Sequence, residues 1–163
     1  DALFEEWLST VGEGVAGYVT PKVAVAAIVA NDDKEILLTQ RADSGVWLYP
    51  VGWADVGYSP AEVAVKEVYE ETGIEAVAAE LCDWRLSNRY EIFAEWRHRY
   101  APGVRYNTEH VYSLQRVATD AVRLAAGEHR DYCWLPWREA AERCFSWSNR
   151  EAILMLPERL AGR

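Results

Sequence analysis

The sequence predicts a single domain of the α/β (α+β) class, because signals for strands and helices alternate along the chain. The chain has 163 residues, of which 50% are hydrophobic and 26% are charged. That length suffices for one well-packed core and is too short for two domains of ordinary size. The composition is that of a globular protein and argues against long disordered segments.

The first strand signals predict a hairpin. Residues 22–30 are apolar after Lys22 and rich in β-branched side chains, and residues 31–33 (Asn-Asp-Asp) supply a turn into residues 35–40. Both segments predict buried strands. Before them, residues 3–8 predict a short amphipathic helix within a helical extension over residues 1–20.

The clearest helix boundaries lie in the middle of the chain. Ser59 can act as an N-cap, Pro60 suits the first helical position, and Glu62 completes a capping box. Thr72 followed by Gly73 is a helix stop. The sequence therefore predicts a helix that begins after Ser59 and ends at this stop.

Shorter signals predict the remaining elements. Strands are expected, in chain order, near residues 46–49, 77–86, 89–95, 109–117 and 132–135, and helices at residues 137–144 and 148–160. Pro157 would shorten or kink the last helix, because a proline inside a helix removes a backbone hydrogen bond.

Charge and cysteine content narrow the range of partners. Three cysteines at wide spacing, Cys82, Cys133 and Cys144, predict neither a disulfide framework nor a zinc site. A formal net charge of -9 repels polyanions, so a nucleic acid polymer is not an expected partner. No apolar run approaches the ~20 residues that span a bilayer, and the first residues lack signal-peptide features. We therefore expect a cytoplasmic protein without a membrane partner.

Acidic residues flank the apolar stripe of the predicted central helix. At about 100° per residue, the stripe contains Ala61, Ala64, Val65 and Val68. Glu67 and Glu71 lie side by side on its flank, with Glu70 nearer to solvent. Two adjacent carboxylates repel one another, and a divalent cation bound between them would replace this repulsion with attraction. Carboxylate oxygens are ligands that suit Mg²⁺ or Mn²⁺. On spacing alone, a solvated acidic face is the commoner explanation.

The whole segment from residue 52 to residue 74 resembles the Nudix box. The positions that match in register are Gly52, Glu67, Val68, Glu70, Glu71, Gly73 and Ile74. The resemblance implies a Nudix fold, with a mixed β-sheet sandwiched between α-helices, for a single domain over residues 1–163. It also implies an enzyme that uses Mg²⁺, or Mn²⁺, to hydrolyse a phosphoanhydride bond.

Two positions depart from the box. Tyr58 stands where the family has its first Glu, and Lys66 stands where the family has an Arg. In the family these residues help to orient the acids that bind the metal, so their replacement removes a carboxylate and a bidentate donor while it keeps one positive charge. Because of these departures, a module that binds nucleotides without hydrolysing them is an alternative function.

The two halves of the chain resemble different branches of the family. Residues 19–74 are similar to ADP-ribose-type hydrolases, whereas the chain from about residue 83 is similar to dihydroneopterin triphosphate pyrophosphatases, also described as dATP pyrophosphohydrolases. The strings that carry the second resemblance are residues 90–93, 96–103, 107–110, 128–129 and 145–149. The pair of resemblances raises the hypothesis of a recombinant or engineered chimaera.

The resemblance also implies roles for individual residues. The expected metal ligands are Glu67, Glu70, Glu71, Glu128 and a backbone carbonyl near Gly52, with Glu67 and then Glu70 as the general base. The expected substrate contacts are Arg41, Arg97, Arg99, Trp53 and Tyr58. Arg97 and Arg99 are expected on one face of a strand, where they could clamp phosphate or neutralise acids. His98 and His110 are weaker candidates for a contact with the base of the substrate.

The function expected from these residues is attack of water on phosphorus in a small phosphorylated metabolite. Both nucleoside-diphosphate-like compounds and nucleoside or dihydroneopterin triphosphates fit this expectation. Another rival is an isopentenyl-diphosphate isomerase on the same scaffold, which would need an acid–base cysteine; the box region contains none. Whether the chain forms a homodimer stays open.

Overall fold

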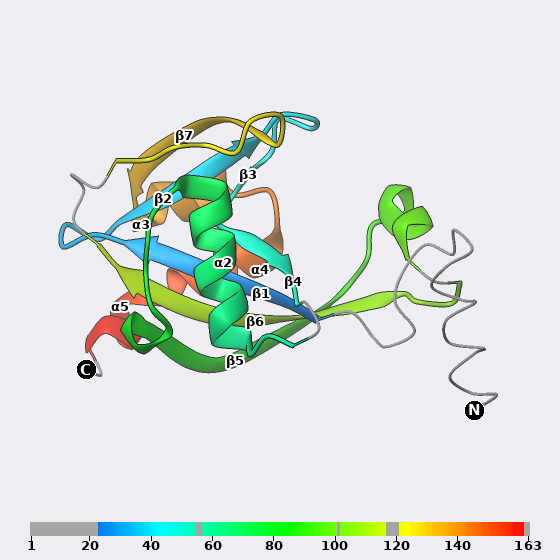
Figure 1. Cartoon of the computed structure of the whole chain (residues 1–163), viewed down its shortest axis with the longest axis horizontal. Coiled ribbons are helices and arrows are strands. Elements are labelled where there is room, and N and C mark those ends of the chain that lie inside the picture. Colours follow the sequence, from blue (N-terminus) through cyan, green and yellow to red (C-terminus); the bar gives the residue numbers. More distant parts are fainter. Residues whose placement is uncertain (1–22, 55–56, 101, 117–120, 162–163) are drawn as a thin grey trace.

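The computed structural model describes residues 23–54, 57–100, 102–116 and 121–161. The helix expected at residues 3–8, with its extension, lies outside them. Within the described residues, seven strands form one mixed sheet, and helices cover both of its faces (Figure 1). The predicted class, a mixed sheet between helices, is confirmed. No helix in this part of the chain is long and apolar enough to cross a bilayer.

Most strands and helices follow one another in the predicted order, but β4 (Val51–Trp53) and the two 3₁₀ helices were not predicted. The strands are β1 (Val23–Ala30), β2 (Glu35–Arg41), β3 (Trp47–Leu48), β4 (Val51–Trp53), β5 (Leu81–Glu91), β6 (Tyr106–Gln115) and β7 (His129–Pro136). The α-helices are α2 (Pro60–Thr72), α3 (Trp137–Arg143), α4 (Trp147–Leu154) and α5 (Leu156–Ala161), and two 3₁₀ helices are η1 (Ala78–Glu80) and η2 (Ala94–Arg99).

Strand β1 lies at the centre of the sheet. It runs parallel to β6 along its whole length and antiparallel to β4. The predicted hairpin is present only near its turn, where Ala30 pairs with Ile36. Beyond that pair, β4 occupies the place beside β1, and β2 pairs instead with β3 and β7.

Both faces of β1 are buried. Its odd-numbered residues pack with α2, and its even-numbered residues pack with α3 and α4 on the opposite face. This alternation follows from the period of two along a strand. Figure 1 shows α2 in front of the sheet and α4 behind it. A continuous apolar strand, as predicted, is what a sheet covered on both faces requires.

Helix α2 begins and ends where the sequence predicts. The Ser59 hydroxyl accepts a hydrogen bond from the Glu62 backbone N–H at 3.3 Å, and the Glu62 carboxylate accepts one from the Ser59 N–H at 3.2 Å. At the other end, Gly73 has a φ of 73° and donates its N–H to the Tyr69 carbonyl. A side chain rarely adopts that left-handed conformation, so the glycine fits the helix stop.

The buried face of α2 is rotated about the helix axis, compared with the predicted stripe, so that it includes one of the acids. Ala64 and Val68 are fully buried as expected. Val63 is also fully buried, whereas Val65 is only half-buried. This rotation places Glu71, with 8% of its surface exposed, in the interface between the helix and the sheet.

The two strands predicted at residues 77–86 and 89–95 form the single strand β5. Its pairing with β6 shifts register between Asp83 and Ser87, and Arg85 has a φ of 51°. A bulge of this kind changes which side chains face the core. The alternation of buried and exposed side chains is therefore interrupted within one strand, and the sequence pattern resembles that of two separate strands.

Two further expectations for the second half are corrected or confirmed. Arg97 and Arg99 do not lie on a strand, because residues 94–99 form η2. The helix predicted at residues 148–160 is divided into α4 and α5 at Met155, two residues before Pro157. The predicted effect of that proline is confirmed, since its ring would clash with an uninterrupted helix.

We predict that Ser59→Ala lowers the free energy of unfolding by about 1 kcal/mol, because it removes the N-cap of α2. Ser59→Gly is the matched control and should cost only a few tenths of a kcal/mol, since glycine tolerates the N-cap conformation and leaves it open to water. Urea unfolding of the two variants measures the difference. An unchanged free energy of unfolding in Ser59→Ala would contradict the role of the cap.

Candidate active site

The acids of α2 lie directly under β4. A Cβ added to Gly52 would overlap the carboxylate of Glu67, so no residue with a side chain could stand at position 52 while Glu67 keeps this position. The matching Gly and Glu of the box therefore form one physical contact between a strand and a helix. Glu67 is half-buried as a result.

The carboxyl group of Glu71 is also enclosed by β4 and α2. Burial raises its pKa well above the ordinary value, and the charges of Glu67 and Glu128 raise it further. A hydrogen bond from the Val51 backbone N–H and the positive charge of Arg41 act in the opposite direction. The protein thus holds several acids close enough to repel one another.

A loop before β7 brings Glu128 to this place. The Arg123 N–H donates to the Thr72 carbonyl at 2.7 Å, which ties the loop to the end of α2. The Ala42 N–H donates to the Glu128 carbonyl at 2.9 Å, which ties it to the end of β2. These two backbone contacts explain why an acid more than 50 residues along the chain influences Glu71.

Glu70 points away from this group toward solvent. Its carboxylate lies 3.9 Å from the Lys66 ammonium, as the i,i+4 spacing predicts. The same ammonium lies 5.4 Å from the centre of the Tyr58 ring. The two residues that depart from the box therefore contact each other through a cation–π interaction, which joins the loop to the helix as an ion pair would. Tyr58 is 51% exposed and does not line the cavity described below.

The donors gathered here suit a hard divalent cation. In the described part of the chain, no three acidic, His or Cys side chains already converge on a common metal position. The buried carboxyl of Glu71, with like charges on either side, is nevertheless a place where a cation would relieve repulsion. All the donors are oxygens, which Mg²⁺ and Mn²⁺ prefer. The residues present therefore fit such an ion.

Arg41 lies beside the acids at the end of β2. Its guanidinium donates two hydrogen bonds to the Asp43 carboxylate, at 2.9 and 2.8 Å. These bonds raise the pKa of Arg41 and lower that of Asp43, and the charges of Glu71 and Glu128 raise the Arg41 pKa further. A fixed positive charge thus stands next to the acid group.

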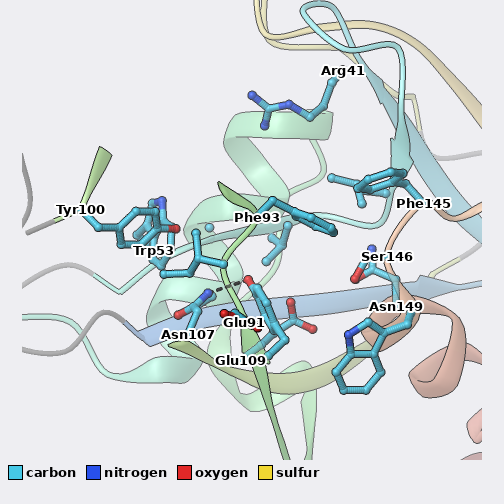
Figure 2. Close-up of a pocket in the computed structure, with 17 residues that line it drawn as sticks. Arg41, Trp53, Glu91, Phe93, Tyr100, Asn107, Glu109, Phe145, Ser146 and Asn149 are labelled. Carbon is cyan, nitrogen blue, oxygen red and sulfur yellow. Dashed lines mark hydrogen bonds between the residues drawn. The ribbon is translucent and has the colours of Figure 1, made fainter. Parts of the chain in front are cut away.

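A cavity of about 390 Å³ opens next to Arg41 and Gly52 on the other side of β4 (Figure 2). Its walls are largely aromatic and comprise Trp53, Tyr90, Phe93, Tyr100, Phe145 and Trp147. The rings of Trp53 and Tyr100 meet edge to face with centroids 5.2 Å apart, and those of Phe93 and Phe145 lie 5.4 Å apart. The volume and lining are those of a site for a small planar ligand.

The floor of the cavity is polar. Glu109 is 3% exposed and accepts a hydrogen bond from the Tyr49 hydroxyl at 3.0 Å. Burial raises its pKa to about 7. Asn107 donates its amide to the Tyr90 hydroxyl at 2.6 Å, and Figure 2 shows it beside Glu109, away from Arg41.

Two amide atoms of this cavity lack partners. They are the carbonyl oxygen of Asn107 and the amide nitrogen of Asn149, and they make up half of the four such buried atoms in the described residues. The Cys144 thiol lies near Asn149, outside hydrogen-bond geometry, and is a weak acceptor in any case. An unpaired buried polar atom costs about 1–3 kcal/mol. The cavity floor is therefore incomplete without a further partner.

The structure brings some of the expected substrate contacts together and separates others. Trp53 and Arg41 line the cavity. Arg97 donates to the Glu91 carboxylate at 2.7 Å and to the Ile92 carbonyl, so it braces residues of the rim. The side chain of Arg99 lies outside the part of the chain that the structure describes.

No individual role was predicted for the acid and the amides of the floor. Asn107 and Glu109 belong to one of the strings that carry the family resemblance. Their spacing of two residues on β6, in step with buried Val111, was a signal that they face inward. Asn149 lies on α4, and only the tertiary structure shows that this helix faces the same cavity.

Known proteins match the chain over most of its length. The family model of the NUDIX domain matches residues 20–156. The dihydroneopterin triphosphate diphosphatase of Escherichia coli (strain K12) is 37% identical over 139 residues, which cover 83% of this chain and 91% of that protein. The protein of the same name from Haemophilus influenzae is 29% identical over 139 residues. The solved structure of the E. coli dihydroneopterin triphosphate pyrophosphohydrolase has a TM-score of 0.74 at 36% identity, and covers 80% of this chain and 91% of its own.

These matches extend over both halves of the chain. A relative that aligns over 139 residues is not confined to the second half, so a chimaeric origin is not supported. Members of the family typically depend on a metal and act on small phosphorylated metabolites. Together with the fold and the acids under β4, the matches show that the chain belongs to the Nudix family and is a Nudix pyrophosphohydrolase.

Proposed function

We propose that the protein hydrolyses a triphosphate attached to a planar heterocycle, with dihydroneopterin triphosphate as the first candidate. The observation that carries this proposal is a juxtaposition. Arg41 and Gly52 line the aromatic cavity, the charges of Glu71 and Glu128 act on Arg41, and the Glu67 carboxylate lies against Gly52. One ligand can therefore place its phosphates near the acids and its ring in the cavity. The names of the matching relatives favour the same substrate class.

The proposed cation ligands are the carboxylates of Glu67, Glu71 and Glu128, the backbone carbonyl near Gly52 and, in an outer position, Glu70. A divalent cation held there would polarise phosphate oxygens and offset the negative charge of the substrate. The chain itself supplies the placement. Gly52 fixes where the carboxylate of Glu67 lies, and the Val51 N–H holds that of Glu71.

Glu67 is the proposed general base. Its carboxylate is held against Gly52 at the junction of the acids and the cavity. From there it can take a proton from the water that attacks phosphorus. Glu70 is the alternative base, although its carboxylate faces solvent and Lys66. Arg41 is proposed to neutralise phosphate charge, because its guanidinium is already oriented by Asp43.

The isomerase alternative receives no support from the cavity. None of the three cysteines is among the residues that line it. Cys144 is buried, and burial raises the pKa of its thiol to about 12, which is unsuited to acid–base work near neutral pH. The nonhydrolytic alternative rested on Tyr58 and Lys66, and the match to a diphosphatase over 83% of the chain does not support it.

We predict Mg²⁺-dependent release of pyrophosphate or phosphate from at least one member of a panel of dihydroneopterin triphosphate, dNTPs and ADP-ribose. Dihydroneopterin triphosphate should give the highest kcat/KM. Release is measured with and without Mg²⁺, because only a hydrolase depends on both substrate and ion. Binding of dihydroneopterin triphosphate without turnover, or a higher kcat/KM on another compound of the panel, would contradict the proposed substrate.

Glu71→Gln should lower turnover by more than about 100-fold, because loss of a residue that only orients a ligand already costs 10- to 100-fold. The fold should persist, since a neutral amide is easier to bury than a carboxylate with charged neighbours. Glu142→Gln, at an exposed position of α3, is the matched control for loss of one negative charge. Equal turnover in the two variants would contradict the assignment of Glu71.

Gly52→Ala should lower turnover by about 100-fold, because the new Cβ must displace the Glu67 carboxylate by roughly 1 Å or more. A double-mutant cycle isolates this contact. In a Glu67→Ala background, Gly52→Ala should no longer alter thermal stability or residual turnover, since the overlapping carboxylate is absent. Additive effects of the two substitutions would mean that they do not act through each other.

A further inference from the structure

The hydrolysis proposed at the acids of α2 does not use the polar residues of the cavity floor. Glu109 is buried where only one described residue, Tyr49, donates to its carboxyl group. Asn107 and Asn149 line the same cavity, and each has a buried amide atom without a hydrogen-bond partner among the described residues. A buried acid and two incomplete amides in an aromatic cavity form an arrangement that a polar ring edge would complete.

We propose that Glu109, Asn107 and Asn149 together select the edge of a 2-amino-4-oxo heterocycle, the edge shared by pterins and guanine. The proposal rests on the proposed function, in that the cavity holds the ring of the hydrolysed substrate. The Glu109 carboxylate accepts the ring N–H and one hydrogen of the exocyclic amine. The Asn107 carbonyl accepts the second amine hydrogen, and the Asn149 amide donates to the ring carbonyl.

The pattern of donors and acceptors is what makes this edge specific. Two adjacent N–H donors match the two oxygens of a carboxylate, and each oxygen keeps a lone pair even where Tyr49 already donates. Adenine places a ring-nitrogen acceptor beside its amine, and this acceptor would face the carboxylate without a proton. The aromatic walls stack on any planar ring, so they add affinity without distinguishing among these edges.

The same arrangement makes ring binding depend on pH. With a Glu109 pKa of about 7, donors from the ring favour the ionised form, so affinity should rise by about tenfold between pH 6 and pH 8. The titratable groups that face Glu109 are Tyr49 and Tyr90, whose pKa values are raised, so both stay protonated in this range. The other charged residues of the cavity, Arg41 and Glu91, are held in ion pairs.

The test is calorimetric titration of the full chain, without metal, with guanosine, inosine, adenosine and dihydroneopterin. These ligands carry no phosphate, so the result does not depend on hydrolysis. Guanosine and dihydroneopterin should bind at least about tenfold more tightly than adenosine. Inosine, which lacks only the exocyclic amine, should also bind more weakly than guanosine. Equal affinity for guanosine, inosine and adenosine would overturn the inference with no variant at all.

Two substitutions assign the preference to the carboxylate. Glu109→Gln should abolish both the preference for guanosine over adenosine and the pH dependence, because an amide offers one acceptor where the edge needs two. Tyr49→Phe is the matched control: it removes the internal hydrogen bond of Glu109 but should retain the preference. An unchanged preference in Glu109→Gln would overturn the inference. Ring preference without hydrolysis of any triphosphate would contradict the proposed function alone, and hydrolysis without ring preference would contradict the inference alone.

Discussion

The close approach of the Glu67 carboxylate to the backbone of Gly52 is the contact on which the rest of the site depends. It lets β4 cross α2 near enough for the neighbouring Val51 N–H to hold Glu71. Burial of Glu71 beside the charge of Glu67 raises its pKa, which opposes its ionisation and therefore opposes folding at neutral pH. The fold accepts that cost at a place where a cation and a polyphosphate can offset it, as is common at functional sites.

Strand β4 also connects the acids to the cavity. Its side chains alternate, so Gly52 faces α2 while Val51 and Trp53 face the opposite side of the sheet, where the cavity lies. The strand is only three residues long and pairs with buried residues of β1, so the two places lie close together on opposite faces of one strand. This geometry suits a substrate whose phosphates and ring are joined by a short linker.

Local signals in the sequence predicted the elements, and long-range packing decided the rest. Ser59 and Gly73 fix the ends of α2 through their own backbone chemistry, and Pro157 limits the last helices in the same way. The acids of the box were visible because the spacing within one helix determines which side chains are neighbours. The cavity floor was not, because Glu109 and Asn149 meet only after β6 has paired with β1 and α4 has packed on the sheet. The bulge at Arg85 misled the strand prediction for a related reason, since periodicity cannot show an extra residue.

We propose that the carboxylates beneath β4 gather a divalent cation next to the aromatic cavity. Crystals soaked in Mn²⁺ and recorded at a wavelength that gives manganese a strong anomalous signal test this proposal. We expect an anomalous peak bounded by oxygens of Glu67, Glu71 and Glu128 and adjoining the Gly52 backbone. A structure in which Mn²⁺ binds elsewhere, or in which these three carboxylates remain apart with no peak between them at saturating Mn²⁺, would contradict it.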